Sequence, residues 1–189
     1  MRPSFSRLLP ANGLRFRKCH SGLTPLDPGG DTALVDELLE GLRVAEADMT
    51  LFFRKLSDTA PGLLAGGELD EPYLKALIHE ISYSPEEFAQ HGRLVRWMRG
   101  YLGRLKQEPA GADAIREGMH RANPKYVLRN YLAQETIESA EVGDLLRLET
   151  LLKVLERPYD EQPGREEFAR KRPEWARTRP GCATLSCSS

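Results

Sequence analysis

The residues most suited to bind an anion follow a predicted helix start. Asn123 is a suitable N-cap and Pro124 suits the first helical position. Lys125, Arg129 and Asn130 come directly after this pair. Because backbone amides and positive charge at a helix N-terminus favour phosphate, the pattern allows a phosphate site. The alternative interpretation is that these polar groups tie the helix to a neighbouring domain.

Thiol chemistry is a second candidate, because two of the three cysteines stand near the C-terminus. Cys182 and Cys187 are five residues apart, which is not the Cys-x-x-Cys spacing of redox or zinc motifs. No histidine is near them in sequence, so zinc is not predicted. Three cysteines are also too few for a disulfide scaffold, and a reducing compartment is the default expectation.

The sequence contains no motif for phosphoryl or nucleotidyl transfer. That chemistry needs a glycine-rich cover over the phosphates, a lysine that contacts them, and Asp or Asn residues that hold the metal. The chain has no Gly-x-Gly-x-x-Gly, no strand-borne lysine motif and no Asp-Phe-Gly. Ser, His and Asp also show no spacing that nominates a hydrolytic site, although such triads are spatial. We therefore predict no catalytic, cofactor-binding or metal-binding residue.

Helices are the elements that must position these side chains. With 40% hydrophobic and 29% charged residues, 189 residues can bury one core and a small appendage. Asp31 is a candidate cap for a helix with leucines on one face, and Ser84-Pro-Glu-Glu87 is a capping box for a helix that reaches about Lys106. Apolar spacing also predicts a short segment over 49–56, a helix over 71–81 and a weak helix that ends at 119.

A helical hairpin is predicted in the second half of the chain. Gly143 can close the helix that starts at Asn123, and Asp144 can cap the next helix, 145–155. Beyond Pro158 the apolar periodicity disappears, so the tail must lie across a surface built elsewhere. The side chains expected to face inward in the hairpin are Val127, Leu128, Tyr131, Leu132, Ile137, Leu148, Leu151, Leu152 and Leu155.

Composition separates the first 30 residues from the rest. They are rich in Arg and Ser and contain no acidic residue before Asp27, which is typical of an organellar transit peptide or a disordered leader. We expect an unstructured or transit-like leader over 1–30, a helical domain over 31–157, and an extended tail over 158–189. The predicted fold class is mostly α, a helical bundle or layer of about five to seven helices followed by that tail.

Three motifs stand in order in the C-terminal part: Asn123-Pro-Lys-Tyr-Val-Leu-Arg-Asn-Tyr-Leu-Ala-Gln134, Arg157-Pro-Tyr-Asp-Glu-Gln-Pro163 and the terminal Ser186-Cys-Ser-Ser189. Together they resemble the C-terminal end of the selenoprotein O family, with similarity expected from about Asp31 onward. The resemblance implies a kinase-like protein whose complete form uses ATP and magnesium to transfer AMP to Ser, Thr or Tyr hydroxyls of proteins. The ATP-handling residues would lie upstream of the part matched here.

The resemblance also implies a role for Cys187, third from the end of the chain. At this position the family carries selenocysteine in some animal members and cysteine in most bacterial ones. The implied role is redox chemistry, in some members through a disulfide to a cysteine of the kinase-like core, and Cys182 is a further candidate. The alternative is an inert terminal cysteine.

Three functional interpretations remain. The chain is the C-terminal helical region of an adenylyltransferase, inactive alone, with the kinase-like core as partner in cis or as a separate chain. Alternatively it is a stand-alone helical protein-interaction module, or a fragment without independent function that exposes apolar patches. A net charge of −1 argues against nucleic acid, and no apolar run reaches the roughly 20 residues of a membrane helix. The expected location is cytoplasmic in a bacterium, or mitochondrial in a eukaryote.

Overall fold

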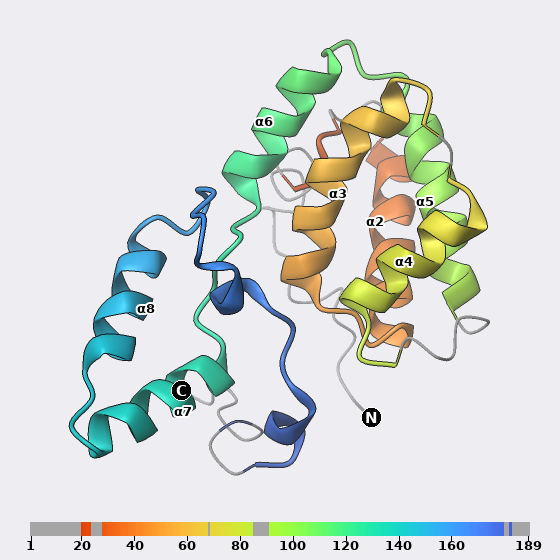
Figure 1. Cartoon of the computed structure of the whole chain (residues 1–189). Helices are drawn as coiled ribbons and strands as arrows, with labels where there is room; N and C mark the ends of the chain where they lie inside the picture. Colours follow the sequence, from red (N-terminus) through yellow and green to blue (C-terminus); the bar gives the residue numbers. More distant parts are fainter. Residues whose placement is uncertain (1–19, 24–27, 68, 85–90, 180–181, 183–189) are drawn as a thin grey trace. The chain divides into compact units, whose positions relative to one another are not determined.

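The computed structural model describes residues 20–23, 28–67, 69–84, 91–179 and 182. These residues form helices joined by loops, so the predicted mostly α fold class is confirmed (Figure 1). The α-helices are α2 (Pro28–Val44), α3 (Met49–Leu64), α4 (Glu71–Ile81), α5 (Gly92–Leu105), α6 (Ala112–Ala122), α7 (Asn130–Glu141) and α8 (Leu146–Glu156), followed by the 3-10 helices η3 (Glu166–Ala169) and η4 (Glu174–Arg177).

Two compact units divide the chain, Met1–Asn123 and Pro124–Ser189. We call them the N-terminal and C-terminal units. The boundary falls inside the helical domain that we predicted over 31–157. The physical reason is that α7 and α8 share a hydrophobic core with residues of the predicted tail, while α2 to α6 share another core.

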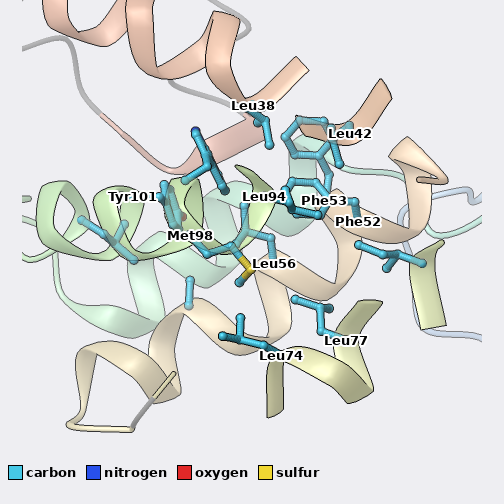
Figure 2. Packing of buried hydrophobic residues seen from close by; sticks show 14 of the residues in the cluster. Leu38, Leu42, Phe52, Phe53, Leu56, Leu74, Leu77, Leu94, Met98 and Tyr101 are labelled. Atoms are coloured by element: carbon cyan, nitrogen blue, oxygen red, sulfur yellow. The ribbon is translucent and has the colours of Figure 1, made fainter. Parts of the chain in front are cut away.

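In the N-terminal unit, α3 lies against α4, α5 and α6, and α2 packs on α5. Figure 2 shows Phe52 and Phe53 of α3 among side chains from α2 and α5. The Phe52 ring meets Trp97 edge-on at 5.8 Å, and Trp97 stacks on Tyr101 at 4.9 Å between ring centroids. These aromatic contacts add geometric preference to the burial of large apolar surfaces, and so fix how α3 and α5 pack.

Residues 20–23 belong to this unit, although they fall in the predicted leader. Leu23 is buried in the core, and the Tyr101 hydroxyl donates a hydrogen bond of 2.7 Å to the Ser21 carbonyl. Burial raises the pKa of Tyr101, so its phenol remains a proton donor. Helix α2 starts at Pro28, which places Asp31 within the helix rather than at its cap. The rest of the leader prediction, 1–19 and 24–27, lies outside the described residues.

Helices α3 and α4 differ in how well the sequence predicted them. Helix α4 has the predicted bounds, and the Asp70 side chain accepts from the Tyr73 amide at 2.8 Å. Helix α3 instead continues beyond residue 56, through Pro61 to Leu64. Burial of Leu63 in this extension offsets the hydrogen bond that the proline cannot donate.

The capping box predicted to start α5 is only partly described, since residues 85–90 lie outside the described ranges. The Ser84 hydroxyl donates to Glu46 Oε2 at 2.9 Å, which joins it to the α2–α3 connection. Helix α5 is described from Gly92, with His91 at its N-cap. The arginines at 93, 96 and 99 are exposed on α5, whereas Arg104 is partly buried and pairs with Glu108 at 2.5 Å.

The hairpin of α7 and α8 forms as predicted. Gly143 has φ of 87°, a left-handed conformation that glycine adopts without steric cost, and Asp144 Oδ1 accepts from the Leu146 amide at 3.0 Å. The inward face is narrower than predicted: Tyr131, Leu132 and Leu151 are buried, whereas Leu128, Ile137 and Leu152 are more than half exposed.

Candidate interaction site in the C-terminal unit

The predicted helix start at Asn123 and Pro124 is wrong. Asn123 instead caps the C-terminal end of α6, and its side chain is occupied in the N-terminal unit. Its Oδ1 lies 2.7 Å from His20 Nδ1, and its Nδ2 donates to Ser57 Oγ at 3.1 Å. A side chain held by these partners cannot cap a helix that follows, and α7 begins only at Asn130.

Lys125 therefore lies in the segment before α7, where it contacts the loop after α8. The backbone amides of Lys125 and Tyr126 both donate to the Pro158 carbonyl, at 2.8 and 3.0 Å. The Lys125 ammonium lies 2.5 Å from Glu161 Oε2. Partial burial acts to lower the pKa of Lys125, but the hydrogen bond and charge of Glu161 outweigh it and raise the pKa above its ordinary value. Lys125 thus joins the segment before α7 to the loop after α8 by an ion pair and a backbone hydrogen bond.

The loop after α8 is itself fixed by Gln162. Its Nε2 donates to the carbonyls of Val154 and Arg157, at 3.0 and 2.8 Å, which satisfies acceptors at the C-terminal end of α8. The Tyr126 hydroxyl donates to the Gln162 carbonyl at 3.3 Å. Two of the three motifs that carry the family resemblance are therefore in direct contact.

Asn130, another predicted site residue, contacts the tail. Asn130 Nδ2 donates to the Cys182 carbonyl at 3.3 Å. Arg129 is partly buried at the N-cap position of α7. Cys182 is 5% exposed within the core of the C-terminal unit, an environment unlike that of an accessible redox thiol. Cys187 lies outside the described residues.

The structure also contains a cleft of about 620 Å³ that the sequence did not reveal. One wall is α7, the other is the tail, and Trp175 meets Tyr131 edge-on at 6.4 Å between ring centroids. The Tyr131 hydroxyl donates to the Arg170 carbonyl at 3.0 Å, which joins the two walls. The lining residues are Tyr131, Leu132, Glu135, Glu138, Ser139, Val142, Arg147, Glu167, Arg170, Lys171, Pro173 and Trp175.

Ion pairs neutralise the acidic side chains of this cleft. Arg147 pairs with Glu135 and lies 4.0 Å from Glu167, while Arg179 pairs with Glu138 at 2.5 Å. The Arg179 guanidinium also lies 5.4 Å from the centre of the Trp175 ring. Sequence reasoning missed these pairs because the partners are far apart in the chain and no periodic pattern connects them.

This arrangement is suited to holding segments together. Each of the cleft's three carboxylates has an arginine partner, so none is placed as a general base. Among the described residues, no three His, Cys, Asp or Glu side chains are grouped as metal ligands.

Comparison with known proteins shows that the chain is similar to bacterial protein nucleotidyltransferases. The protein nucleotidyltransferase YdiU of Rhodopirellula baltica is 45% identical over 179 residues, which cover 89% of this chain and 32% of that protein. The YdiU proteins of Xanthomonas axonopodis pv. citri and Nitrosospira multiformis are 47% and 40% identical, and the matches cover 29% and 33% of their lengths. The chain thus spans about a third of the length of these bacterial relatives.

The sequence model of the protein adenylyltransferase SelO family matches residues 14–156. The chain belongs to this family, and the resemblance noted from its motifs is confirmed. The match begins before Asp31, so the expectation that similarity starts there is wrong. In the part of the chain that the structure describes, no helix combines the length and apolar character needed to cross a membrane.

Proposed function

We propose that this chain supplies the C-terminal helical region of a SelO-family protein adenylyltransferase. The complete protein transfers AMP from ATP to Ser, Thr or Tyr hydroxyls of proteins, with magnesium, and this chain does not transfer AMP alone. The observation that carries the proposal is the family match over 14–156 in a chain that spans about a third of its relatives. The chemistry of nucleotide transfer would then come from the kinase-like core.

The contacts of the C-terminal unit support this proposal. The residues that carry the resemblance, such as Lys125 and Gln162, bind one another and the backbone. Such contacts stabilise the packing of a helical region. The sequence also lacks the phosphate-cover and metal-holding motifs that transfer requires.

AMP transfer from labelled ATP to protein tests the proposal. The samples are this purified chain, the complete Rhodopirellula baltica relative, and a full-length chimera in which this chain replaces the matching third of that relative. We expect no transfer by the chain alone and transfer by the chimera. Transfer by the chain alone, or an inactive chimera that is folded, would contradict the proposal.

A stand-alone interaction module is the second candidate. It is favoured by the separate hydrophobic core of each unit, since each can bury apolar surface without a further domain. The same experiment separates the two candidates, because a stand-alone module gives the chimera no activity.

A further inference from the structure

Helix α8 carries more apolar surface than the C-terminal unit covers. Leu151 and Val154 are buried in the core of that unit. A second stripe consists of Leu145, Leu148, Leu152 and Leu155, at steps of three, four and three residues. This spacing places the four side chains along one face of a helix, and we call them the leucine stripe.

Two of the four leucines in the stripe are exposed. Leu145 and Leu152 are 53% and 54% exposed, and Leu148 is half-buried. Leu155, at the inner edge, is partly buried against the core of the unit. Single exposed leucines are ordinary, but a helical series that continues a buried face is the pattern of a helix packed on both sides.

The charges beside the stripe indicate what would pack there. Glu149 follows Leu145 by four residues and Glu156 follows Leu152 by four, so both carboxylates border the stripe on its outer side. Both are exposed, and among the described residues neither forms an ion pair; the exposed Lys153, four residues after Glu149, lies beyond them on the side away from the stripe. An apolar stripe with an acidic border is complementary to a helix that has an apolar stripe flanked by Lys or Arg.

We propose that the leucine stripe is the docking surface for the remaining two thirds of the full-length family protein. The occupant is an apolar helix with basic flanking residues in that part of the protein. The proposal rests on the proposed function. Two observations support it: the family match includes α8 up to Glu156, and the relatives are about three times longer than the length matched here.

Hydroxyl-radical footprinting read by mass spectrometry tests the docking surface directly. Side-chain oxidation is compared between the isolated chain and the full-length chimera. We expect Leu145 and Leu152 to be labelled several-fold less in the chimera, while labelling of Met49, an exposed residue of the N-terminal unit, stays unchanged. Equal labelling of the two leucines in both proteins would overturn the proposal.

The double variant Leu145→Asp/Leu152→Asp gives a second readout. Since both side chains are exposed, we expect the melting temperature of the isolated chain to stay unchanged. In the chimera we expect AMP transfer to fall about tenfold or more, through lost docking. Met49→Asp is the control, because it places one such charge on another exposed apolar position and should leave transfer unchanged.

The outcomes distinguish this proposal from the proposed function. A folded chimera without transfer contradicts the proposed function. The labelling of Leu145 and Leu152 in that chimera still shows whether the leucine stripe is covered. An active chimera that is indifferent to Leu145→Asp/Leu152→Asp overturns the docking surface alone. Protection of the leucines in the isolated chain that disappears on dilution would identify a second copy as the occupant, which also overturns the proposal.

Discussion

Asn123, at the end of α6, binds both α3 and the segment around His20 in the N-terminal unit. Its Nδ2 donates to the His20 carbonyl at 2.9 Å and to Ser57, while its own carbonyl accepts from Arg54 Nη1 at 3.1 Å. The side chain is 2% exposed. Because water cannot replace these hydrogen bonds, the loss of the amide would leave buried polar groups without their partners.

Asn123→Ala should lower the free energy of unfolding of the N-terminal unit by about 1–3 kcal/mol. Urea unfolding followed by the fluorescence of Trp97, in a Trp175→Phe background, measures this change. Gln107→Ala is the control: it alters an exposed amide with one long hydrogen bond, and should change stability by less than about 0.5 kcal/mol. An unchanged urea midpoint for Asn123→Ala would show that the buried contacts carry no net stability.

Lys125→Met should destabilise the C-terminal unit by at most about 1 kcal/mol at neutral pH, because its partner Glu161 is well exposed to solvent. The pKa of Lys125 is raised in the folded state, so its contribution is fully present below the ordinary value of 10.5 and is lost as the pH rises through the folded pKa. The difference between wild type and variant should therefore stay level from about pH 7 to pH 10 and shrink above that range. Urea unfolding at several pH values, followed by Trp175 in a Trp97→Phe background, measures it. A difference that grows with alkaline pH contradicts the assignment.

Residues that begin or end a helix could be predicted from the sequence where they act on their own helix. The bounds of α4 and the closing role of Gly143 after α7 were predicted correctly, because such signals depend on a few adjacent residues. The prediction for Asn123 was wrong, since its side chain binds residues far away in the sequence. The segment predicted over 49–56 was too short, because burial of Leu63 continues the helix. The cleft between α7 and the tail rests on non-local ion pairs, which no periodicity encodes.

The same substitution at two glycines should act in opposite directions. Gly143→Ala should destabilise the C-terminal unit by about 1 kcal/mol, since alanine is strained at a φ of 87° although nothing obstructs a Cβ there. Gly103→Ala, in the exposed interior of α5 and also in open space, should stabilise the N-terminal unit by up to about 1 kcal/mol. Unfolding curves of the two single-tryptophan backgrounds give both values. Equal signs would contradict the conformational explanation.

For the whole molecule, each unit carries its own core and one of the two tryptophans. Trp97 is buried in the N-terminal unit, while Trp175 is 42% exposed in the C-terminal unit. The two residues are therefore separate reporters of the two units. This property allows a direct test of whether the chain unfolds in one step.

We expect the two reporters to give different urea transitions, with the steeper dependence on urea for the N-terminal unit because it exposes more surface on unfolding. Fluorescence of the Trp175→Phe and Trp97→Phe variants measures the two curves separately. Far-ultraviolet circular dichroism of each variant is the control that both proteins are folded at the start. Coincident midpoints and slopes would show that the units unfold as one.

The contact of Lys125 and Tyr126 with Pro158 sets a practical limit for shortened versions of this protein. Truncation after Glu156, the last residue of the family match, would delete the carbonyl that receives both amides and the Gln162 amide that closes α8. Such a shortened chain would retain α7 and α8. It would lose the segment after α8, which binds both the residues before α7 and the C-terminal end of α8. Expression designs guided by the family boundary would therefore produce a frayed hairpin, whereas those that continue through residue 182 would keep the core intact.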